Sequence, residues 1–173
     1  MKNRLQTLAT ILTALFVFPF GSNGNSFKIE PVSSFDLNRY LGKWYEIARL
    51  PTWFEKDLIN VTATYSLNKN GKVKVQNEGN KNGIIKKAIG KAKIAKNLNV
   101  GYLKVSFFGP FYADYKIIVL DTSYQYAMVA SSAKYLWILS RDPKMNEEVL
   151  KELVGKADKL GFKTNQLIYT KQQ

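Results

Sequence analysis

The string Leu41-Gly42-Lys43-Trp44-Tyr45-Glu46-Ile47-Ala48-Arg49 decides how this chain folds. Residues 35–40, just before it, predict a short helical turn. Gly42 gives the backbone room for a close approach. The alternating residues after it predict a strand over 43–50, which Pro51 ends. The string therefore marks the entry of the chain into a sheet.

Seven further segments carry the residues and alternation typical of strands: 59–67, 72–78, 84–95, 100–107, 115–120, 124–130 and 134–140. Asn and Gly residues within 68–71 and 79–83 favour tight turns between them. No helical pattern separates the strands. Eight strands at short, regular spacing predict an all-β, antiparallel, up-and-down barrel.

Residues 146–160 break the β pattern and predict one amphipathic helix. Asn146 is suited to cap it and Gly161 to end it. We expect this helix to pack against the outside of the barrel, followed by a last short strand within 166–170.

Charge and residue usage limit the partners and the chemistry. The chain has 26 Lys and Arg against 13 Asp and Glu, a net charge of +13, or +11 without Lys2 and Arg4. This indicates either an anionic neighbour or a solvated lysine-rich surface. The lysines alternate with apolar residues in strands, as in Lys72-Val73-Lys74-Val75, so we predict no nucleic-acid partner.

The chain contains no Cys and no His. This excludes thiol nucleophiles, histidine bases, disulfides and nearly every zinc or haem ligand set. We therefore predict no metal and no cofactor. Any catalysis would rest on carboxylates, Lys, Tyr and Ser.

Residues 1–24 read as an export signal: Lys2 and Arg4 precede a mostly apolar stretch, and Ser22-Asn23-Gly24 offers small residues for cleavage. We expect residues 25–173 to form a single domain in an exported protein. The apolar stretch is shorter than the about 20 residues that a spanning helix needs, so a retained membrane anchor is the lesser alternative.

Five strings in order resemble the lipocalin family, and within it the bacterial outer-membrane lipocalins and apolipoprotein D. They are residues 41–49, quoted above; Val61-Thr62-Ala63-Thr64-Tyr65-Ser66-Leu67; Lys104-Val105-Ser106-Phe107-Phe108-Gly109-Pro110-Phe111-Tyr112; Leu120-Asp121-Thr122-Ser123-Tyr124; and Trp137-Ile138-Leu139-Ser140-Arg141-Asp142-Pro143. The resemblance spans residues 34–172. It implies a lipocalin barrel with Gly42, Trp44, Asp121, Tyr124 and Arg141 as structural signature residues, Trp44 and Arg141 meeting at the closed end.

The resemblance also implies a cavity for one small amphipathic lipid. Alternate residues of a strand point to the same face. If Trp44 points inward, so do Glu46 and Ala48. If Arg141 points inward, so do Tyr135, Trp137 and Leu139. The family placement adds Tyr65 and Asn77, and the apolar strand face adds Val105 and Phe107. The alternative is that these are core residues of a filled barrel.

The predicted function is non-enzymatic binding, storage or transport of a fatty acid or lysophospholipid in the periplasm or at the outer membrane. Bacterial relatives carry an acylated cysteine after the leader, and this sequence lacks it. Two alternatives remain. One is a lipid-modifying enzyme, although the sequence offers Glu46 no evident second carboxylate. The other is a basic surface protein that binds anionic envelope lipids.

Aromatic residues on the predicted loops suggest a further surface. They are Trp53, Phe54, Phe108, Phe111 and Tyr112. We interpret them as a membrane contact or a homodimer contact, or as side chains folded over the rim of the barrel.

Overall fold

The computed structural model describes residues 29–173, so the predicted signal peptide, residues 1–24, lies outside the described residues. The elements are α1 (Leu37–Tyr40), β1 (Gly42–Arg49), β2 (Ile59–Leu67), β3 (Val73–Lys81), β4 (Ile84–Ile94), β5 (Tyr102–Phe108), β6 (Phe111–Leu120), β7 (Tyr126–Ser132), β8 (Tyr135–Ser140), α2 (Glu147–Lys159), a 3-10 turn (Thr164–Gln166) and β9 (Ile168–Tyr169).

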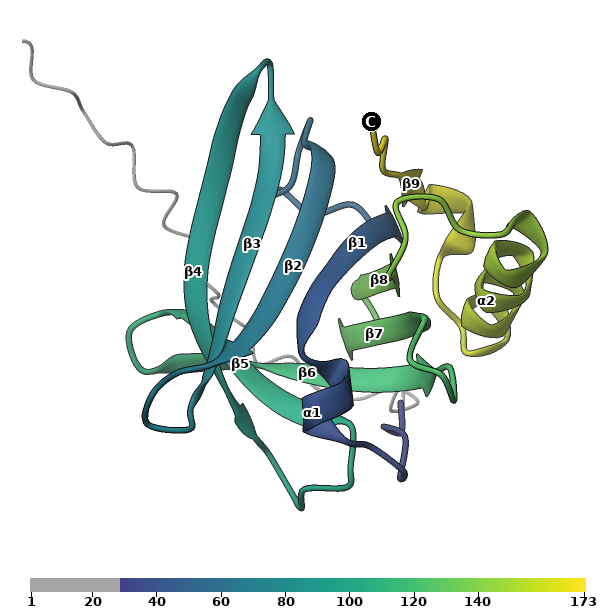
Figure 1. Cartoon of the computed structure of the whole chain (residues 1–173). Coiled ribbons are helices and arrows are strands. Elements are labelled where there is room, and N and C mark those ends of the chain that lie inside the picture. The colour runs from purple at the N-terminus through teal and green to yellow at the C-terminus, as the bar shows by residue number, and fades with distance from the viewer. Residues whose placement is uncertain (1–28) are drawn as a thin grey trace, which may run out of the picture.

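Consecutive strands from β1 to β8 pair antiparallel, and β8 pairs in turn with β1, so the sheet closes into a barrel. Strand β9 adds to β1 at the height of Ala48 and Arg49. Helix α2 lies outside the barrel beside β7, β8 and β9 (Figure 1). The predicted eight-stranded antiparallel barrel with one external helix is confirmed. No helix within residues 29–173 is long and apolar enough to cross a membrane.

Two clusters of buried apolar side chains stabilise the barrel and the packing of α2 against it. The first fills the closed half of the barrel and includes Trp44, Tyr65 and Leu103. The second lies between the barrel wall and α2, where Leu153 and Ala157 pack with wall residues such as Ile138. Each fully buried large side chain contributes roughly 1.5–3 kcal/mol of transfer free energy.

Helix α2 begins and ends as its sequence predicts. The Asn146 side chain accepts hydrogen bonds from the backbone N–H groups of Glu148 (2.8 Å) and Val149 (3.2 Å). Gly161 follows the helix at φ +87°, a conformation that favours glycine.

Two strands are longer than the sequence predicts. Strand β3 runs on to Lys81, and the turn consists only of Asn82 (φ +52°) and Gly83 (φ +82°), so 79–83 was wrong as a turn. Gly79 instead lies inside the strand, where an added Cβ would come within 3.1 Å of Leu58. Strand β6 begins at Phe111 rather than at residue 115, because Gly109 and Pro110 alone reverse the chain.

A β-bulge in β1 corrects the predicted parity of Ala48. Glu46 pairs with Leu139 and Ala48 with Ile138, so Ile47 is an extra residue in the ladder. Beyond the bulge, the β1 positions that would have pointed into the barrel point outward, and the others point inward. Ala48 packs in the outer cluster beneath α2, and Arg49 takes the inward direction expected for Ala48.

The closed end of the barrel is locked by Arg141. Its guanidinium carbon lies 3.9 Å from the centroid of the Trp44 ring, and its N–H groups donate to the backbone carbonyls of Lys43, Arg39 and Tyr40. An added Cβ on Gly42 (φ +96°) would approach Arg141 Nη1 to 3.2 Å. The bare glycine therefore makes room for the guanidinium.

The turn between β6 and β7 lies at the same end. Asp121 Oδ2 accepts hydrogen bonds from the backbone N–H groups of Ser123 and Gln125, each at 3.1 Å. Tyr124 takes φ +61° and its hydroxyl accepts from Asp36 N at 2.8 Å, which ties the turn to the start of α1.

Candidate functional site

The open half of the barrel holds a cavity of about 370 Å³. Its volume is within the range of small-molecule sites. Most of its lining is apolar or aromatic; the lining residues are Glu46, Phe54, Glu55, Val61, Thr62, Ala63, Tyr65, Val75, Asn77, Ala88, Val105, Phe107, Phe108, Phe111, Ala113, Asp114, Tyr115, Ser131, Trp137 and Leu139.

The structure brings most of the predicted ligand residues together on this wall. Those that line the cavity are Glu46, Tyr65, Asn77, Val105, Phe107, Trp137 and Leu139. Tyr135 does not line it. The Tyr135 ring stacks on Trp137, with centroids 6.1 Å apart and an interplanar angle of 9°, and also on Phe54 at 6.5 Å. It therefore supports the wall from behind.

Tyr65 and Tyr115 form the floor of the cavity, and Tyr40, which does not line it, completes their hydrogen-bond network. Tyr65 Oη donates to Tyr115 Oη at 2.7 Å, and Tyr115 Oη also lies 2.7 Å from Tyr40 Oη. Burial raises the pKa of all three phenols, so they are neutral near physiological pH. The floor is polar but uncharged.

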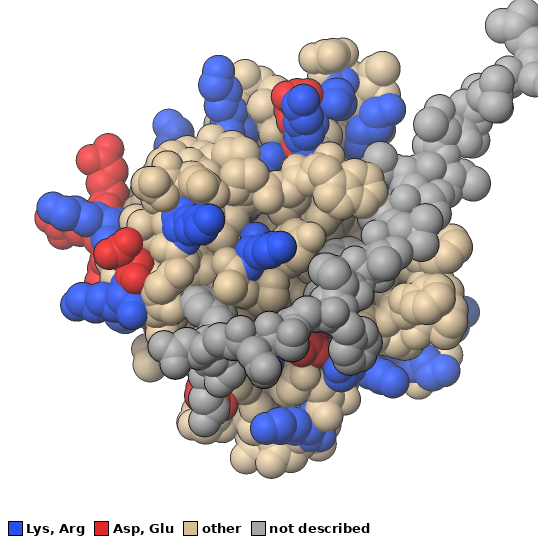
Figure 2. Space-filling model, turned by 180° about the vertical axis from the view of Figure 1, so that it is seen from behind, with Lys and Arg blue, Asp and Glu red and all other residues tan. Residues whose placement is uncertain are grey.

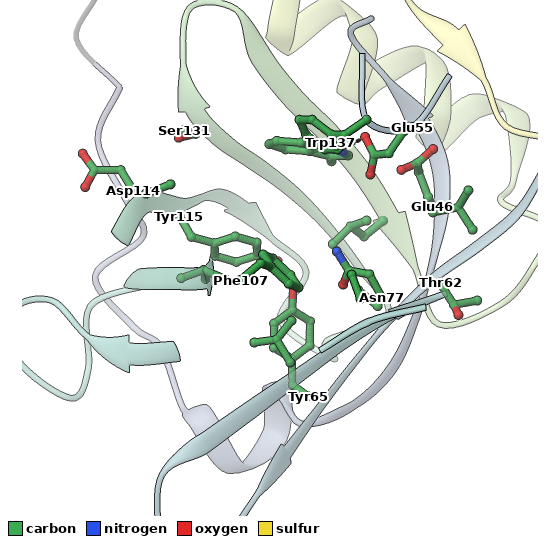
Figure 3. A pocket seen from close by; sticks show the side chains of 18 of the residues that line it. Glu46, Glu55, Thr62, Tyr65, Asn77, Phe107, Asp114, Tyr115, Ser131 and Trp137 are labelled. Atoms are coloured by element: carbon green, nitrogen blue, oxygen red, sulfur yellow. Dashed lines mark hydrogen bonds between the residues drawn. The ribbon is translucent and has the colours of Figure 1, made fainter. Parts of the chain in front are cut away.

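A charged cluster stands at the opposite end of the cavity (Figure 3). Arg49, only 2% exposed, extends Nη1 to within 3.5 Å of Glu46 Oε1 and Nε to within 3.4 Å of Glu55 Oε2. Its Nη2 donates to the Glu55 carbonyl oxygen at 2.6 Å. Glu55 Oε2 also accepts from Thr52 Oγ1 (2.8 Å) and Trp137 Nε1 (3.2 Å).

The two carboxyl groups of this cluster share one guanidinium. Burial, followed by the nearby charge of Glu55, raises the pKa of Glu46 to about 8. Burial also raises the pKa of Glu55, against which its hydrogen bonds from Thr52 and Trp137 and the charge of Arg49 act. Near pH 7 Glu46 therefore holds its proton, and Arg49 remains in contact with both carboxyl groups.

The C-terminal residues complete the wall beside Glu46. Strands β1 and β2 pair only between Gly42 and Tyr45, and above that point they separate. Gln172 Nε2 crosses the gap and donates to the carbonyl oxygens of Glu46 (2.8 Å) and Val61 (2.9 Å). Thr170 Oγ1 donates to Glu46 Oε1.

Comparison with known families identifies the barrel. The family described as "Lipocalin-like domain" matches residues 35–172 of this chain. The chain belongs to the lipocalin family.

This lipocalin is similar to several named proteins. It is 45% identical over 157 residues to "Outer membrane lipoprotein Blc" of Vibrio cholerae, covering 88% of this chain and 92% of the relative. It is 41% identical to the protein of that name from Escherichia coli, over 98% of both chains. It is 34% identical to apolipoprotein D of Macaca fascicularis, over 83% of both chains.

Among solved structures, this lipocalin resembles insecticyanin from the tobacco hornworm Manduca sexta. The TM-score is 0.73, with 23% identity, and the match covers 88% of each chain. At this identity the likeness concerns the fold.

Sequence reasoning missed two members of the charged cluster in this lipocalin. Arg49 was missed because nothing in the local sequence marks the bulge that turns it inward. Glu55 lies in the loop between β1 and β2, and only tertiary contacts bring it back over the cavity. The expectation that Glu46 has no second carboxylate nearby was therefore wrong. Asp114 was missed because β6 begins earlier than predicted, and Tyr115, inside the predicted strand, was not assigned to the cavity.

Carboxylate oxygens can also bind metal ions. Within residues 29–173 no group of three or more His, Cys, Asp or Glu side chains is arranged to hold a metal ion. Glu46 and Glu55 instead make their contacts with Arg49 and with hydroxyl and indole donors.

Proposed function

We propose that this lipocalin binds one small amphipathic lipid, a fatty acid or a lysophospholipid, in the barrel cavity. It stores or transports that lipid unchanged in the bacterial cell envelope. The observation that carries the proposal is the cavity itself: about 370 Å³, mostly apolar along its length and polar at its two ends. An apolar cavity with a few placed polar groups suits an acyl chain with one head group.

The relatives support the location. Those from Vibrio cholerae and Escherichia coli are named as outer membrane lipoproteins. We infer that this chain is exported and acts in the periplasm or at the outer membrane. In this proposal the contact with the membrane is made by the protein surface and needs no acylated cysteine.

The rim of the open end offers that surface. The turns between alternate strands meet there, and they carry the exposed side chains of Trp53, Ile84, Ile85, Phe108 and Phe111. Lys86 and Lys134 lie in or next to the same turns. Aromatic residues beside lysines suit the interface of an anionic bilayer. We propose the same rim as the surface on which a homodimer would form. Sedimentation of the protein without lipid would detect such a dimer.

A lipid-modifying enzyme is the second candidate, and the Glu46–Glu55 pair is the observation that favours it. Two carboxyl groups side by side, one of them with its pKa raised to about 8, are the components of acid–base catalysis. Here, however, both groups are held by Arg49 and by donors from Thr52, Trp137 and Thr170. Lipid turnover by the purified protein that is lost in Glu46→Gln would establish this candidate instead.

Replacing Trp137 tests whether the cavity is the binding site. Trp137→Ala removes the largest side chain of the upper wall. We expect it to weaken lipid binding about tenfold or more in displacement of a cavity-bound fluorescent probe. Tyr169→Ala removes an exposed aromatic side chain on the outer strand β9 and should leave the affinity unchanged. If folded Trp137→Ala bound lipid with unchanged affinity, the cavity would not be the lipid-binding site.

A further inference from the structure

A seam lies in the barrel wall between β1 and β2. The two strands pair only from Gly42 to Tyr45 on β1. Above that level β1 continues to Arg49 and β2 begins at Ile59, and their edges are no longer joined to each other. Glu46 and Val61 lie on the two sides of the seam, and both line the cavity. At the seam, therefore, β1 and β2 do not form a continuous sheet between the cavity and solvent.

Residues 168–172 fill this seam, and we call them the C-terminal strap. On one side its strand β9 pairs with β1, and Thr170 N donates to the Ile47 carbonyl oxygen at 3.0 Å. On the other side Asn60 N of β2 donates to the Lys171 carbonyl oxygen at 2.8 Å. The strap thus takes the place of a strand between β1 and β2.

The strap is held mainly by polar contacts near the surface. Its ladder with β1 has two residue pairs, and the side chains of Ile168 and Tyr169 are 41% and 58% exposed. Gln172 Nε2 adds hydrogen bonds to the carbonyl oxygens of Glu46 and Val61. Water replaces contacts of this kind when a segment lifts, and segments with little buried apolar area open locally at low free energy.

The loop over the open end of the barrel is held by buried groups instead. Its Glu55 carboxyl group lies 3.4 Å from Arg49 Nε and accepts hydrogen bonds from Thr52 and Trp137. Arg49 is 2% exposed. Moving the loop would take one carboxyl group away from a buried guanidinium, which is costly. Lifting the strap leaves these contacts intact, so it is the easier of the two movements.

The space that the strap occupies is large enough to admit a ligand. Neighbouring strands lie about 4.8 Å apart, so β1 and β2 stand about 10 Å apart where the strap lies between them. Residues 46–49 of β1 span about 13 Å along the seam. A window of this size admits a hydrocarbon chain or a flat aromatic molecule.

We propose that the C-terminal strap is a lateral gate of the cavity. It lifts from the seam between β1 and β2, the ligand enters or leaves there, and the strap then closes the wall again. The loop over the open end stays in place during this exchange. The inference rests on the proposed function, because it concerns the route by which a ligand reaches the cavity.

A gate has a kinetic signature that a binding residue lacks. The strap closes the wall in both the free and the ligand-bound protein, so holding it closed raises the barriers to entry and to exit equally. The association and dissociation rate constants then fall by the same factor, and Kd does not change. Loss of a ligand contact changes Kd instead.

A disulfide between β9 and β1 would hold the gate closed. Ala48 and Tyr169 are register partners, and partners in an antiparallel pair have a Cα separation that suits a disulfide. The chain has no Cys, so the double variant Ala48→Cys/Tyr169→Cys forms no competing disulfide. Reduction reopens the gate in the same protein, and the oxidised and reduced forms are therefore compared directly.

A matched disulfide away from the seam is the control. Lys116→Cys/Ala130→Cys joins β6 to β7, where these two residues are register partners. Ala130 is fully buried, as Ala48 is. The control therefore reports any general effect of a cross-link on the barrel.

Stopped-flow fluorescence of Nile red measures the exchange. Basic side chains outnumber acidic ones on the face in Figure 2, so an anionic probe would also bind to the outer surface, whereas Nile red is neutral. We expect oxidation of Ala48→Cys/Tyr169→Cys to lower both rate constants about fivefold or more and to change Kd by less than about twofold. Oxidation of the control should change neither rate constant.

The outcomes separate the gate from the proposed function. Equal rate constants in the oxidised and reduced forms would overturn the lateral gate and leave binding in the cavity in place. A change in Kd with an unchanged association rate constant would also overturn the gate, because the strap would then act as part of the binding wall. Failure of Nile red to bind the unaltered protein would overturn the proposed function itself.

A second variant tests the gate without a disulfide. Gln172→Ala removes the two side-chain hydrogen bonds that the strap makes across the seam. We expect both rate constants to rise about twofold or more. Gln173→Ala is its control, because Gln173 contacts Asn60 through its backbone N–H and lies outside the strap. Equal rate constants in Gln172→Ala and Gln173→Ala would contradict the gate.

Discussion

At the scale of single residues, the controlling feature is the buried acid Glu46. It is 3% exposed, shares Arg49 with Glu55 and accepts a hydrogen bond from Thr170. One guanidinium cannot neutralise two carboxylates, so Glu46 stays protonated until its pKa of about 8 is passed. Its charge state therefore links the stability of the barrel to pH.

Glu46→Gln should flatten that dependence. Folding raises the pKa of Glu46 from 4.5 to about 8, so between these pH values the folded state holds a proton that the unfolded state releases. The free energy of unfolding thus falls as pH rises through this window and levels off above it. At about pH 9 the free energy of unfolding of the ligand-free variant should exceed that of wild type by up to about 5 kcal/mol.

Urea unfolding at a series of pH values measures this effect. Glu78→Gln is the control, since Glu78 is in an exposed ion pair that holds its pKa below the ordinary value. It should retain the wild-type slope between pH 4.5 and about 8. A Glu46→Gln slope as steep as that of wild type would contradict the account of the cluster.

At the scale of elements, the gap between β1 and β2 is closed by the end of the chain. The two strands pair only from Gly42 to Tyr45, and the side chain of Gln172 joins them above that point. β9 adds two backbone pairs on the edge of β1 that faces β2, above the point where β2 separates from it. The last residues therefore belong to the barrel wall.

Gln172→Ala should loosen this part of the wall. It removes two hydrogen bonds to buried carbonyl oxygens, at a cost of about 1–2 kcal/mol. We expect faster amide hydrogen exchange in the upper part of β1. Gln173→Ala is the matched control, because the Gln173 contact with Asn60 is made by its backbone N–H. Equal exchange in both variants would contradict the role of Gln172.

Sequence predicts elements well here and their irregularities poorly. The alternation of apolar and polar residues predicted each of the eight strands, and Asn146 and Gly161 predicted the limits of α2, because these signals are local in the sequence. The bulge at Ile47 depends on the pairing of β1 with β8, and the return of Glu55 depends on Arg49. Both are tertiary effects. Trp137 and Tyr65 were predicted on the cavity wall, whereas the acid pair was not.

At the scale of the whole molecule, a strongly basic protein carries exposed apolar side chains around the open end of its barrel. Trp53 and Phe111 extend from separate turns at the open end and are 59% and 60% exposed. In the membrane contact that we propose, the net charge of +13 would attract an anionic surface and the rim would supply the groups that enter it. This arrangement would bring the cavity mouth to the lipid.

Replacing both aromatic residues with serine should reduce binding to vesicles. We expect Trp53→Ser/Phe111→Ser to lose several-fold in partitioning onto phosphatidylglycerol vesicles, because each ring contributes apolar area at the interface. Leu98→Ser, at an exposed position near the closed end, should bind like wild type. Equal loss in both variants would place the membrane contact away from the rim.

The most direct test of the central claim is to identify what the cavity carries. The chain from residue 25 onward is purified, measured by native mass spectrometry and extracted for lipid analysis. The account predicts about one single-chain lipid per protein, with a smaller bound fraction in Trp137→Ala. A protein that is empty, and whose cavity takes up no single-chain lipid when one is added, would contradict it.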